Sequence, residues 1–239
     1  MRIAIHQPNY LPWCGYFYKM GQVDLFVVLD DCSFTKAGVT HRVRIKTPQG
    51  TSWLTVPVGK REVPILGLSP DCSQDWGMRH WNVIKNSYSK SKFWSEVAPW
   101  LKPLLKTKWQ KLVDLNLQGI REIATVLGIA TPLLRTSGLP EGVRRTLGSG
   151  SMRNVRICQY LGAGTYVSGQ GARDYNQEQA FAAAGISLEY VAFEHPVYPQ
   201  AGEGFVPGLS VLDLLFNCGP QSKQLLFNLP LKQVEIGTA

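Results

Sequence analysis

Two kinds of hydrophobic pattern fill the first thirty residues. "RIAI" is a short apolar run that ends at His6, and "DLFVVLDD" (24–31) is a continuous apolar run typical of a strand covered on both faces. Between them, "LPWCGYFYKMGQV" (11–23) has aromatic and apolar residues at helical spacing, with Pro12 suited to a first turn and Gly21 to a C-terminal stop. This order predicts a βαβ unit with two parallel strands.

The next segment alternates residue by residue. In "HRVRIKTPQGTSWLTVPV" (41–58), charged and apolar side chains alternate, the chain turns at Pro48, and a second extended run follows. This pattern predicts a β-hairpin. The two-residue period places Arg42, Arg44 and Lys46 on one face, as either a solvated outer face or an anion site.

The rest of the chain returns to helical and α/β patterns. Apolar residues three and four apart predict helices between Trp76 and Leu127. Residues 135–152 are rich in Gly, Ser and Pro and predict a hinge, a mobile loop or the entry to a second half. The C-terminal part predicts a helix at 154–163, a strand at 165–169, a helix at 176–185, a strand at 187–195 and a helix at 209–219.

Together these elements predict an α/β fold with a mainly parallel sheet and flanking helices, a β-hairpin insertion near 41–58 and a helical middle segment. We expect a single domain over residues 1–239. The alternative is a subdivision into an N-terminal part, 1–135, and a C-terminal part, 150–239.

Composition narrows the setting. The 239-residue chain is 44% hydrophobic, enough for a sizeable core, yet it has no 18-residue apolar run that would span a membrane. The apolar run before His6 is also too short for a signal peptide. Five cysteines with no C-x-x-C pair argue against a disulfide framework and a zinc site, so we expect a cytoplasmic protein with no metal.

The formal charge of +8 fits either a Lys/Arg-rich surface of a soluble protein or an acidic partner. A nucleotide, a phosphopantetheine carrier protein and RNA all fit. The basic clusters come with no classical nucleic-acid motif, and we expect no DNA partner.

Candidate chemistry gathers where strands end. In a parallel unit His6 and the Asp30–Asp31 pair lie at the same carboxyl edge, where open α/β sheets bind ligands. A histidine oriented by a carboxylate is a general base near neutral pH. The alternative is a structural histidine, with aspartates that only cap the following loop.

Two later junctions resemble the first. "YVSGQGARDY" (166–175) predicts a strand, a small polar loop and a helix, in which Ser168 and Gly169 let backbone N–H groups approach an anion. A plain strand-to-helix turn explains it equally. "FEHPVYPQ" (193–200) predicts a strand that stops at His195, either a second site histidine or a turn that uses proline.

Cysteine nucleophiles are disfavoured. Cys14 falls within the apolar helical pattern and behaves as a small hydrophobe. Cys32 follows Asp30 and Asp31, whose charges raise the pKa of a thiol. Whether any cysteine reacts stays open at this point.

Six stretches in consistent order span nearly the whole chain and resemble the WbqC-like protein family. They are "AIHQPNYLPWCGYFYK", "DLFVVLDDCSFTK", "RIKTPQGTSWLTVPV", "YVSGQGARDY", "EHPVYPQ" and "FVPGLSVLDLLFNCG". Family members are often encoded among genes for O-antigen or secondary-metabolite assembly. The resemblance implies attachment of an amino-acid or acyl unit to an amine, such as glycine to an amino sugar.

The resemblance also carries residues over to this chain. The matching positions are His6, Gln7, Asn9, Tyr10, Trp13, Tyr16, Lys19, Asp30, Asp31, Arg42, Arg44, Lys46, Ser168, Gly169, His195, Tyr198 and Asp213. The family usually reads Gln-Asn-Arg-Asn-Arg where this chain has "THRVR" (40–44), and Cys14 and Cys32 replace residues that are usually aliphatic. The first departure leaves the substrate open, and the second argues against a cysteine mechanism as a family trait.

The leading hypothesis is therefore an amide-forming N-acyltransferase or aminoacyltransferase. A thioester or ester on an acidic carrier protein or a tRNA would donate to a small-molecule or sugar amine. We expect His6, Asp30, Asp31 and His195 to be catalytic. The residues expected to bind substrate are Gln7, Asn9, Tyr10, Trp13, Tyr16, Lys19, His41, Arg42, Arg44, Lys46, Ser168, Gly169 and Tyr198.

Within this hypothesis, Gln7, Asn9 or the Ser168–Gly169 loop would stabilise the oxyanion, and the hairpin cations would bind phosphates of the donor. No cofactor is expected beyond a donor linked to phosphopantetheine or tRNA. Two alternatives stay open: a nucleotidyl-transfer or adenylate-forming enzyme that uses ATP, and a non-catalytic module that binds a carrier. The sequence leaves the donor, the acceptor and the oligomeric state undetermined.

Overall fold

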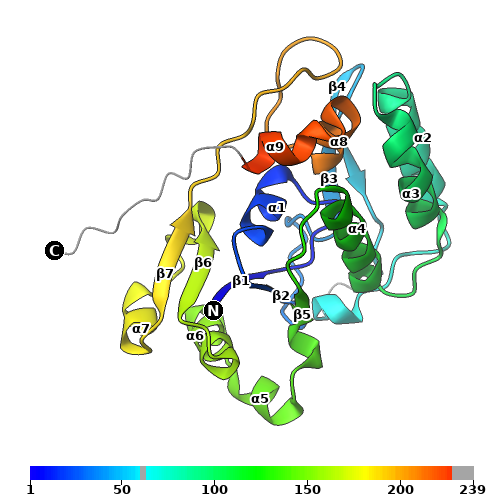
Figure 1. The fold of residues 1–239 in the computed structure, drawn as a ribbon. Coiled ribbons are helices and arrows are strands. Elements are labelled where there is room, and N and C mark those ends of the chain that lie inside the picture. The colour runs from blue at the N-terminus through cyan, green and yellow to red at the C-terminus, as the bar shows by residue number, and fades with distance from the viewer. Residues whose placement is uncertain (60–62, 228–239) are drawn as a thin grey trace.

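The fold is built on a parallel β-sheet with helices on both faces (Figure 1). The computed structural model describes residues 1–59 and 63–227. In this part of the chain the sheet strands are β1 (Arg2–His6), β2 (Leu25–Val28), β5 (Leu133–Arg135), β6 (Thr165–Gly169) and β7 (Ser187–Val191), in the order β5-β2-β1-β6-β7. The prediction of an α/β fold with a parallel sheet is confirmed.

The strand order reverses at β1, the central strand. The chain first moves outward from β1 to β2 and β5, then returns to the other side of β1 as β6 and β7. Parallel crossovers are right-handed, so a change of direction along the sheet moves the connecting helices to the opposite face. The reversal therefore covers both faces of the sheet.

One face carries the helices that follow β1 and β2, together with the last two helices. They are α1 (Cys14–Met20), α2 (Trp76–Tyr88), α3 (Trp94–Lys106), α4 (Leu112–Val126), α8 (Val211–Cys218) and α9 (Gln221–Phe227). The other face carries α5 (Glu141–Thr146), α6 (Gly150–Leu161) and α7 (Glu178–Ala183). Among the described residues, no helix is both long and apolar enough to cross a membrane.

The alternation of side chains along β1 divides the core in two. Ala4 belongs to the larger cluster, where α1, α4 and α8 pack. Ile3 and Ile5 point to the opposite face and pack in a second cluster with Cys158 of α6 and Phe181 of α7. By the same alternation, His6 falls on the α1 side of the sheet.

The hairpin insertion is confirmed as β3 (Arg42–Thr47) and β4 (Gly50–Thr55), an antiparallel pair in which Arg44 is opposite Trp53. The helical middle segment is confirmed as α2, α3 and α4.

Two boundary predictions were wrong. The first helix begins at Cys14, because Leu11 has a left-handed φ of 42° and the chain is still extended at Trp13. β7 ends at Val191, so His195 lies four residues beyond the strand rather than at its end. Of the three alternatives for residues 135–152, the structure fits the entry to the second half: the stretch holds the end of β5, the whole of α5 and the start of α6, and it leads to β6 and β7.

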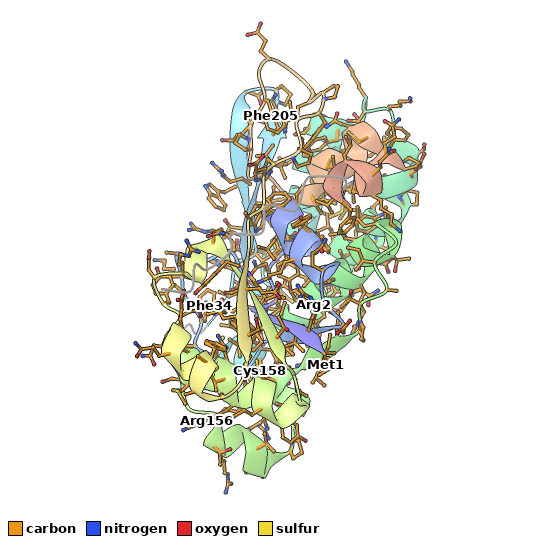
Figure 2. The ribbon with its side chains drawn as sticks, turned by 60° about the vertical axis from the view of Figure 1, so that its left-hand side comes forward. Met1, Arg2, Phe34, Arg156, Cys158 and Phe205 are labelled. Atoms are coloured by element: carbon orange, nitrogen blue, oxygen red, sulfur yellow. The ribbon has the colours of Figure 1, made fainter. Side chains whose placement is uncertain are left out.

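A long segment between β7 and α8 crosses the top of the sheet in Figure 1 and returns beside the hairpin. Buried Asp213 of α8 fixes it, because the Tyr198 and Tyr88 hydroxyls donate to its carboxylate at 2.8 and 2.9 Å. Figure 2 shows Phe205 of this segment near the hairpin, at the opposite end of the molecule from Arg156 on α6.

The packing of α2 on α3 leads to a stability prediction. A Cβ atom at Gly77 would lie 2.0 Å from the backbone oxygen of Leu105, whereas one at Gly142 in α5 would meet nothing within 4 Å. Overpacking costs about 1–3 kcal/mol, so we expect Gly77→Ala to destabilise the protein by that amount in urea unfolding. Gly142→Ala, the matched helical control, should be neutral or stabilise by about 0.5–1 kcal/mol. Equal effects would contradict this packing.

Candidate functional site

A cleft opens where β1 and β6 separate. The two strands pair only through Arg2–Thr165 and Ile3–Tyr166, although β1 continues to His6 and β6 to Gly169. A cavity of about 460 Å³ lies between their carboxyl ends. This is the topological switch point of the sheet, the usual ligand site in open α/β folds.

The cleft walls are largely apolar and include five aromatic rings among the described residues; they come from β1, α1 with the preceding Trp13, β6 with the turn after it, and the end of β7 with Phe193. They consist of Ile5, His6, Trp13, Gly15, Tyr16, Lys19, Tyr166, Ser168, Gly169, Gln170, Gly171, Ala172, Tyr175, Val191 and Phe193. Two ionisable nitrogen groups, of His6 and Lys19, therefore share one apolar hollow.

His6 is held as a neutral ring. Its Nδ1 lies 3.0 Å from the Gln7 carbonyl oxygen, which can only accept, so Nδ1 carries the proton and Nε2 keeps a lone pair. The ring meets the edge of Tyr16 at a centroid distance of 4.9 Å. Burial, reinforced by the charge of Lys19, lowers the pKa of His6 to about 3. His6 is thus an unprotonated acceptor at neutral pH.

Lys19 is a buried cation without a counter-ion. Its side chain is 7% exposed, and over residues 1–59 and 63–227 its Nζ has neither a carboxylate nor a hydrogen-bond acceptor. The Nζ atom lies over the Phe26 ring, 6.0 Å from the ring centroid. Burial lowers the pKa of Lys19 to about 7.

Trp13 forms the cleft wall that faces the segment between β7 and α8. Its indole covers Gly15, where a Cβ atom would lie 2.3 Å from the ring, so this position needs glycine. Phe193 and His195 pack on the indole at centroid distances of 5.2 and 5.3 Å. His195 Nε2 accepts the Gly208 N–H at 3.1 Å, and this bond occupies its lone pair. His195 therefore supports Trp13 and does not line the cleft.

The aspartates that were expected to orient His6 are committed elsewhere. Asp30 is fully buried and binds Arg135 Nε at 2.7 Å and Ser137 N at 2.9 Å. Asp31 pairs with Arg153 of α6 at 2.5 Å. In the described part of the chain, no hydrogen bond or ion pair joins either carboxylate to His6.

The reason is that β2 has two neighbours. Its far side pairs with β5, and Val28 lies opposite Arg135, so Asp30 turns toward the end of β5 and away from β1. The sequence placed His6 and the two aspartates at the same edge of the sheet. In the structure, residues at the end of β5, the second neighbour of β2, bind Asp30, and Arg153 binds Asp31.

Most polar residues of the loop after β1 form hydrogen bonds within the protein and do not face the cleft. Gln7 donates to the sulfur of Cys32 at 3.3 Å, and the Tyr10 hydroxyl bonds Nδ1 of His80 at 2.9 Å. Asn9 is buried and lines a separate cavity of about 50 Å³. Of the three groups expected to stabilise an oxyanion, only the Ser168–Gly169 segment lines the main cleft.

The hairpin cations share a face as predicted but do not reach the main cleft. Arg42 donates to the Ala37 and Gly38 carbonyls, and Lys46 donates to those of Glu203 and Gly204. The Arg44 guanidinium has no hydrogen-bond acceptor among the described residues and lies 5.9 Å from the Trp53 ring. It lines the small cavity, which has Trp13 as a common wall with the cleft.

His41 and Tyr198 also lie outside the cleft lining. His41 is buried against Phe34 at a centroid distance of 5.1 Å, and Tyr198 is bound to Asp213. Both residues were expected to bind substrate, but the structure places them in contacts within the protein, away from the cleft.

Comparison with known proteins gives the chain's family. The profile of the WbqC-like protein family matches residues 7–225. This chain belongs to the WbqC-like family. An uncharacterized protein of Mycobacterium tuberculosis, Rv1507c, is 36% identical over 230 residues, covering 94% of this chain and 97% of that protein. No solved structure matches the chain.

In this WbqC-like chain the turn after β6 differs from the prediction. A three-residue 3-10 turn, Gln170–Ala172, follows the strand, and α7 begins only at Glu178. The prediction of a helix N-terminus beside Ser168 was therefore wrong. The turn instead brings its small residues and Tyr175 to the cleft wall.

Several cleft residues of this WbqC-like chain were not predicted from the sequence. Tyr166, Gln170 and Tyr175 lie within the 166–175 stretch and Phe193 begins the 193–200 stretch, but none of them was expected to be a site residue, and Val191 lies outside both stretches. The missing information was the pairing of β1 with β6, which places residues 5–6 opposite residues 168–169.

Cys14 and Cys32 have environments that disfavour a thiolate. Burial raises the pKa of Cys14 to about 12, and burial is also the main cause of the raised pKa of Cys32. In the described residues, no group of three or more His, Cys, Asp or Glu side chains could hold a metal ion.

Asp30 and His6 should respond differently to substitution. Asp30→Ala removes several hydrogen bonds to a buried charge and should lower the free energy of unfolding by about 2–3 kcal/mol. His6→Ala should cost less, because the His6 ring has one local hydrogen bond and faces a cleft. Urea unfolding of both variants checks this, and a larger loss for His6→Ala would contradict the assignment.

Lys19 should make stability depend on pH. Its pKa is about 7 in the folded chain against 10.5 when exposed, so between these values the unfolded chain binds more protons. The destabilisation is complete below pH 7 and is relieved as pH rises, by up to about 1.4 kcal/mol per unit. Lys19→Met should therefore be more stable than wild type at pH 6.5, with the difference shrinking by pH 9.5. If urea unfolding gave the same difference in free energy of unfolding between Lys19→Met and wild type at pH 6.5 and pH 9.5, the prediction would be contradicted.

Proposed function

We propose that this WbqC-like protein forms amides by acyl or aminoacyl transfer in the cleft between β1 and β6. The donor is a thioester or ester carried by an acidic carrier protein or a tRNA, and the acceptor is a small-molecule or sugar amine. The observation that carries the proposal is the neutral His6 ring, whose Nε2 lone pair has no partner among the described residues inside an aromatic cleft.

The chemistry needs one base and no external reductant or oxidant. The amine nitrogen attacks the thioester carbonyl carbon, and His6 Nε2 takes the proton that the nitrogen loses. Because burial lowers the pKa of the free His6 ring to about 3, this proton transfer needs the bound substrate to raise that pKa. The C–S bond then breaks as the carbonyl re-forms, and the departing thiolate receives the proton from His6. An amide and a free thiol result.

The tetrahedral intermediate places a negative charge on the former carbonyl oxygen. Because β1 and β6 stop pairing before Ser168, this segment pairs with β7 alone, and the side toward β1 faces the cleft. N–H groups in such a position are suited to an oxyanion. This assigns to Ser168–Gly169 the role that Gln7 and Asn9 are not placed to fill.

The donor arm would approach from the hairpin side. Arg44 and the half-exposed Trp53 lie across Trp13 from the cleft, and the Arg44 guanidinium is available for a phosphate. The net charge of +8 favours an acidic carrier over a basic one.

Replacement of the base tests the reaction. His6→Ala should lower the rate of amide formation about a hundredfold or more, because it removes the proton acceptor. His195→Ala should change the rate less than tenfold, since His195 acts only through Trp13. The rates are measured by mass spectrometry of the amide, with an acyl-loaded carrier protein or an aminoacyl-tRNA and a panel of amines. Near-normal turnover of His6→Ala would overturn the assignment.

The same assay separates the other classes of function. The reaction should proceed without ATP. Amide formation that needs ATP and releases pyrophosphate would indicate an adenylate-forming enzyme. Tight carrier binding with no product from any amine would indicate a non-catalytic binding module.

A further inference from the structure

Two polar groups on the cleft side of α1 lack partners. Tyr16 and Lys19 are one helical turn apart, with side chains 1% and 7% exposed. The Tyr16 hydroxyl is buried without a hydrogen bond in the described residues, and the Lys19 ammonium is without a counter-ion there. Both side chains lie against the Phe26 ring, with a centroid distance of 5.1 Å for Tyr16 and an Nζ distance of 6.0 Å for Lys19.

A buried hydroxyl and a buried ammonium without acceptors are both costly. Lys46 is a contrasting lysine: it is equally buried, but its ammonium donates to two carbonyls. Both unsatisfied groups in α1 line the cleft. What they lack among the described residues is an acceptor, which a ligand in the cleft can supply.

We infer that the substrate of this cleft carries a carboxylate, bound by the Lys19 ammonium and the Tyr16 hydroxyl. A carboxylate presents two oxygens, one for each donor. A phosphate fits less well, because phosphate sites use several cations or Arg forks, and this cleft has one lysine among aromatic walls. The aromatic walls suit an apolar body attached to that carboxylate.

The inference rests on the proposed function only for the statement that the ligand is the amine acceptor. A carboxylate near Lys19 would neutralise one of the two causes that lower the pKa of His6. Binding the correct substrate would then make His6 a better base at the moment it is needed. Lys19 is in this sense a binding residue that also tunes His6.

The ionisable groups around Lys19 make the pH dependence simple. His6 on β1, Tyr16 on α1, Tyr166 on β6 and Tyr175 beyond β6 share the cleft, and no acidic side chain of the described residues lines it. Near neutral pH only Lys19 changes charge among the His6–Lys19 pair. A bound carboxylate holds the lysine proton, so affinity is greatest below pH 7 and falls up to tenfold per unit above it.

The experiment measures binding without turnover. We would titrate the full chain with 3-phenylpropanoate, with phenethylamine, which lacks the carboxylate, with L-phenylalanine, and with inorganic phosphate, using calorimetry and NMR of the four histidine rings. We expect 3-phenylpropanoate and L-phenylalanine to bind, to raise the pKa of His6 and to bind less tightly at pH 9 than at pH 6.5. Binding of phosphate or phenethylamine alone, or of none of the four, would overturn the inference.

Variants assign the effect to the two donors. Lys19→Met should weaken carboxylate binding at least tenfold and raise the pKa of His6 in the free protein, while Tyr16→Phe should weaken binding several-fold. Lys19→Arg, which keeps its charge, should bind 3-phenylpropanoate with no pH dependence between 7 and 9. Lys46→Met is the matched buried control and should leave the affinity unchanged. Equal losses in the Lys19→Met and Lys46→Met variants would overturn the inference.

Failure of the inference and failure of the proposed transfer can be told apart. Carboxylate binding that depends on Lys19, together with no amide product, would sustain the site and refute the transfer reaction. The opposite result is transfer that depends on His6, proceeds equally to amines with and without a carboxylate, and is unaffected by Lys19→Met. This result would sustain the transfer reaction and refute the carboxylate site.

Discussion

The handedness of parallel crossovers governs this structure. Because each strand–helix–strand connection is right-handed, the reversal of strand order at β1 sends α1 and α4 to one face and α6 and α7 to the other. At the point where the chain changes direction, α1 lines one side of the space between β1 and β6. β1 and β6 pair for two residues and separate, and the cleft occupies the gap.

The charged groups at the carboxyl edge of the sheet differ in whether they have partners. Around β2 and β5, Asp30 and Asp31 are matched by Arg135 and Arg153, and hydroxyl and backbone donors fill the remaining acceptor positions. Around β1 and β6, Lys19 and Tyr16 are buried without matching acceptors. The carboxylates around β2 and β5 thus support the fold, whereas Lys19 and Tyr16 border the cavity, where a ligand has room.

The loop after β1 joins these two parts of the carboxyl edge. Asn116 holds the Pro8 carbonyl at 2.8 Å, and Ser210 holds that of Leu11 at 2.8 Å, next to the left-handed conformation of Leu11. These bonds come from α4 and from the start of α8, far along the chain. They keep Trp13 and α1 in a fixed position against β6, and the cleft therefore has a rigid wall.

The sequence by itself determined the βαβ start, the hairpin, the helical middle segment and the parallel sheet, because these follow from periodicities of two and 3.6 residues and from local Gly and Pro signals. It also indicated His6 and the 166–175 turn as cleft residues. Only the tertiary structure decided the partners. Pairing of β2 with β5 drew Asp30 to Arg135, and the short pairing of β1 with β6 brought His6, Lys19 and Ser168 around one cavity. Local sequence fixes which edge a side chain reaches, whereas its neighbours there depend on strand order, which is set by contacts more than a hundred residues apart.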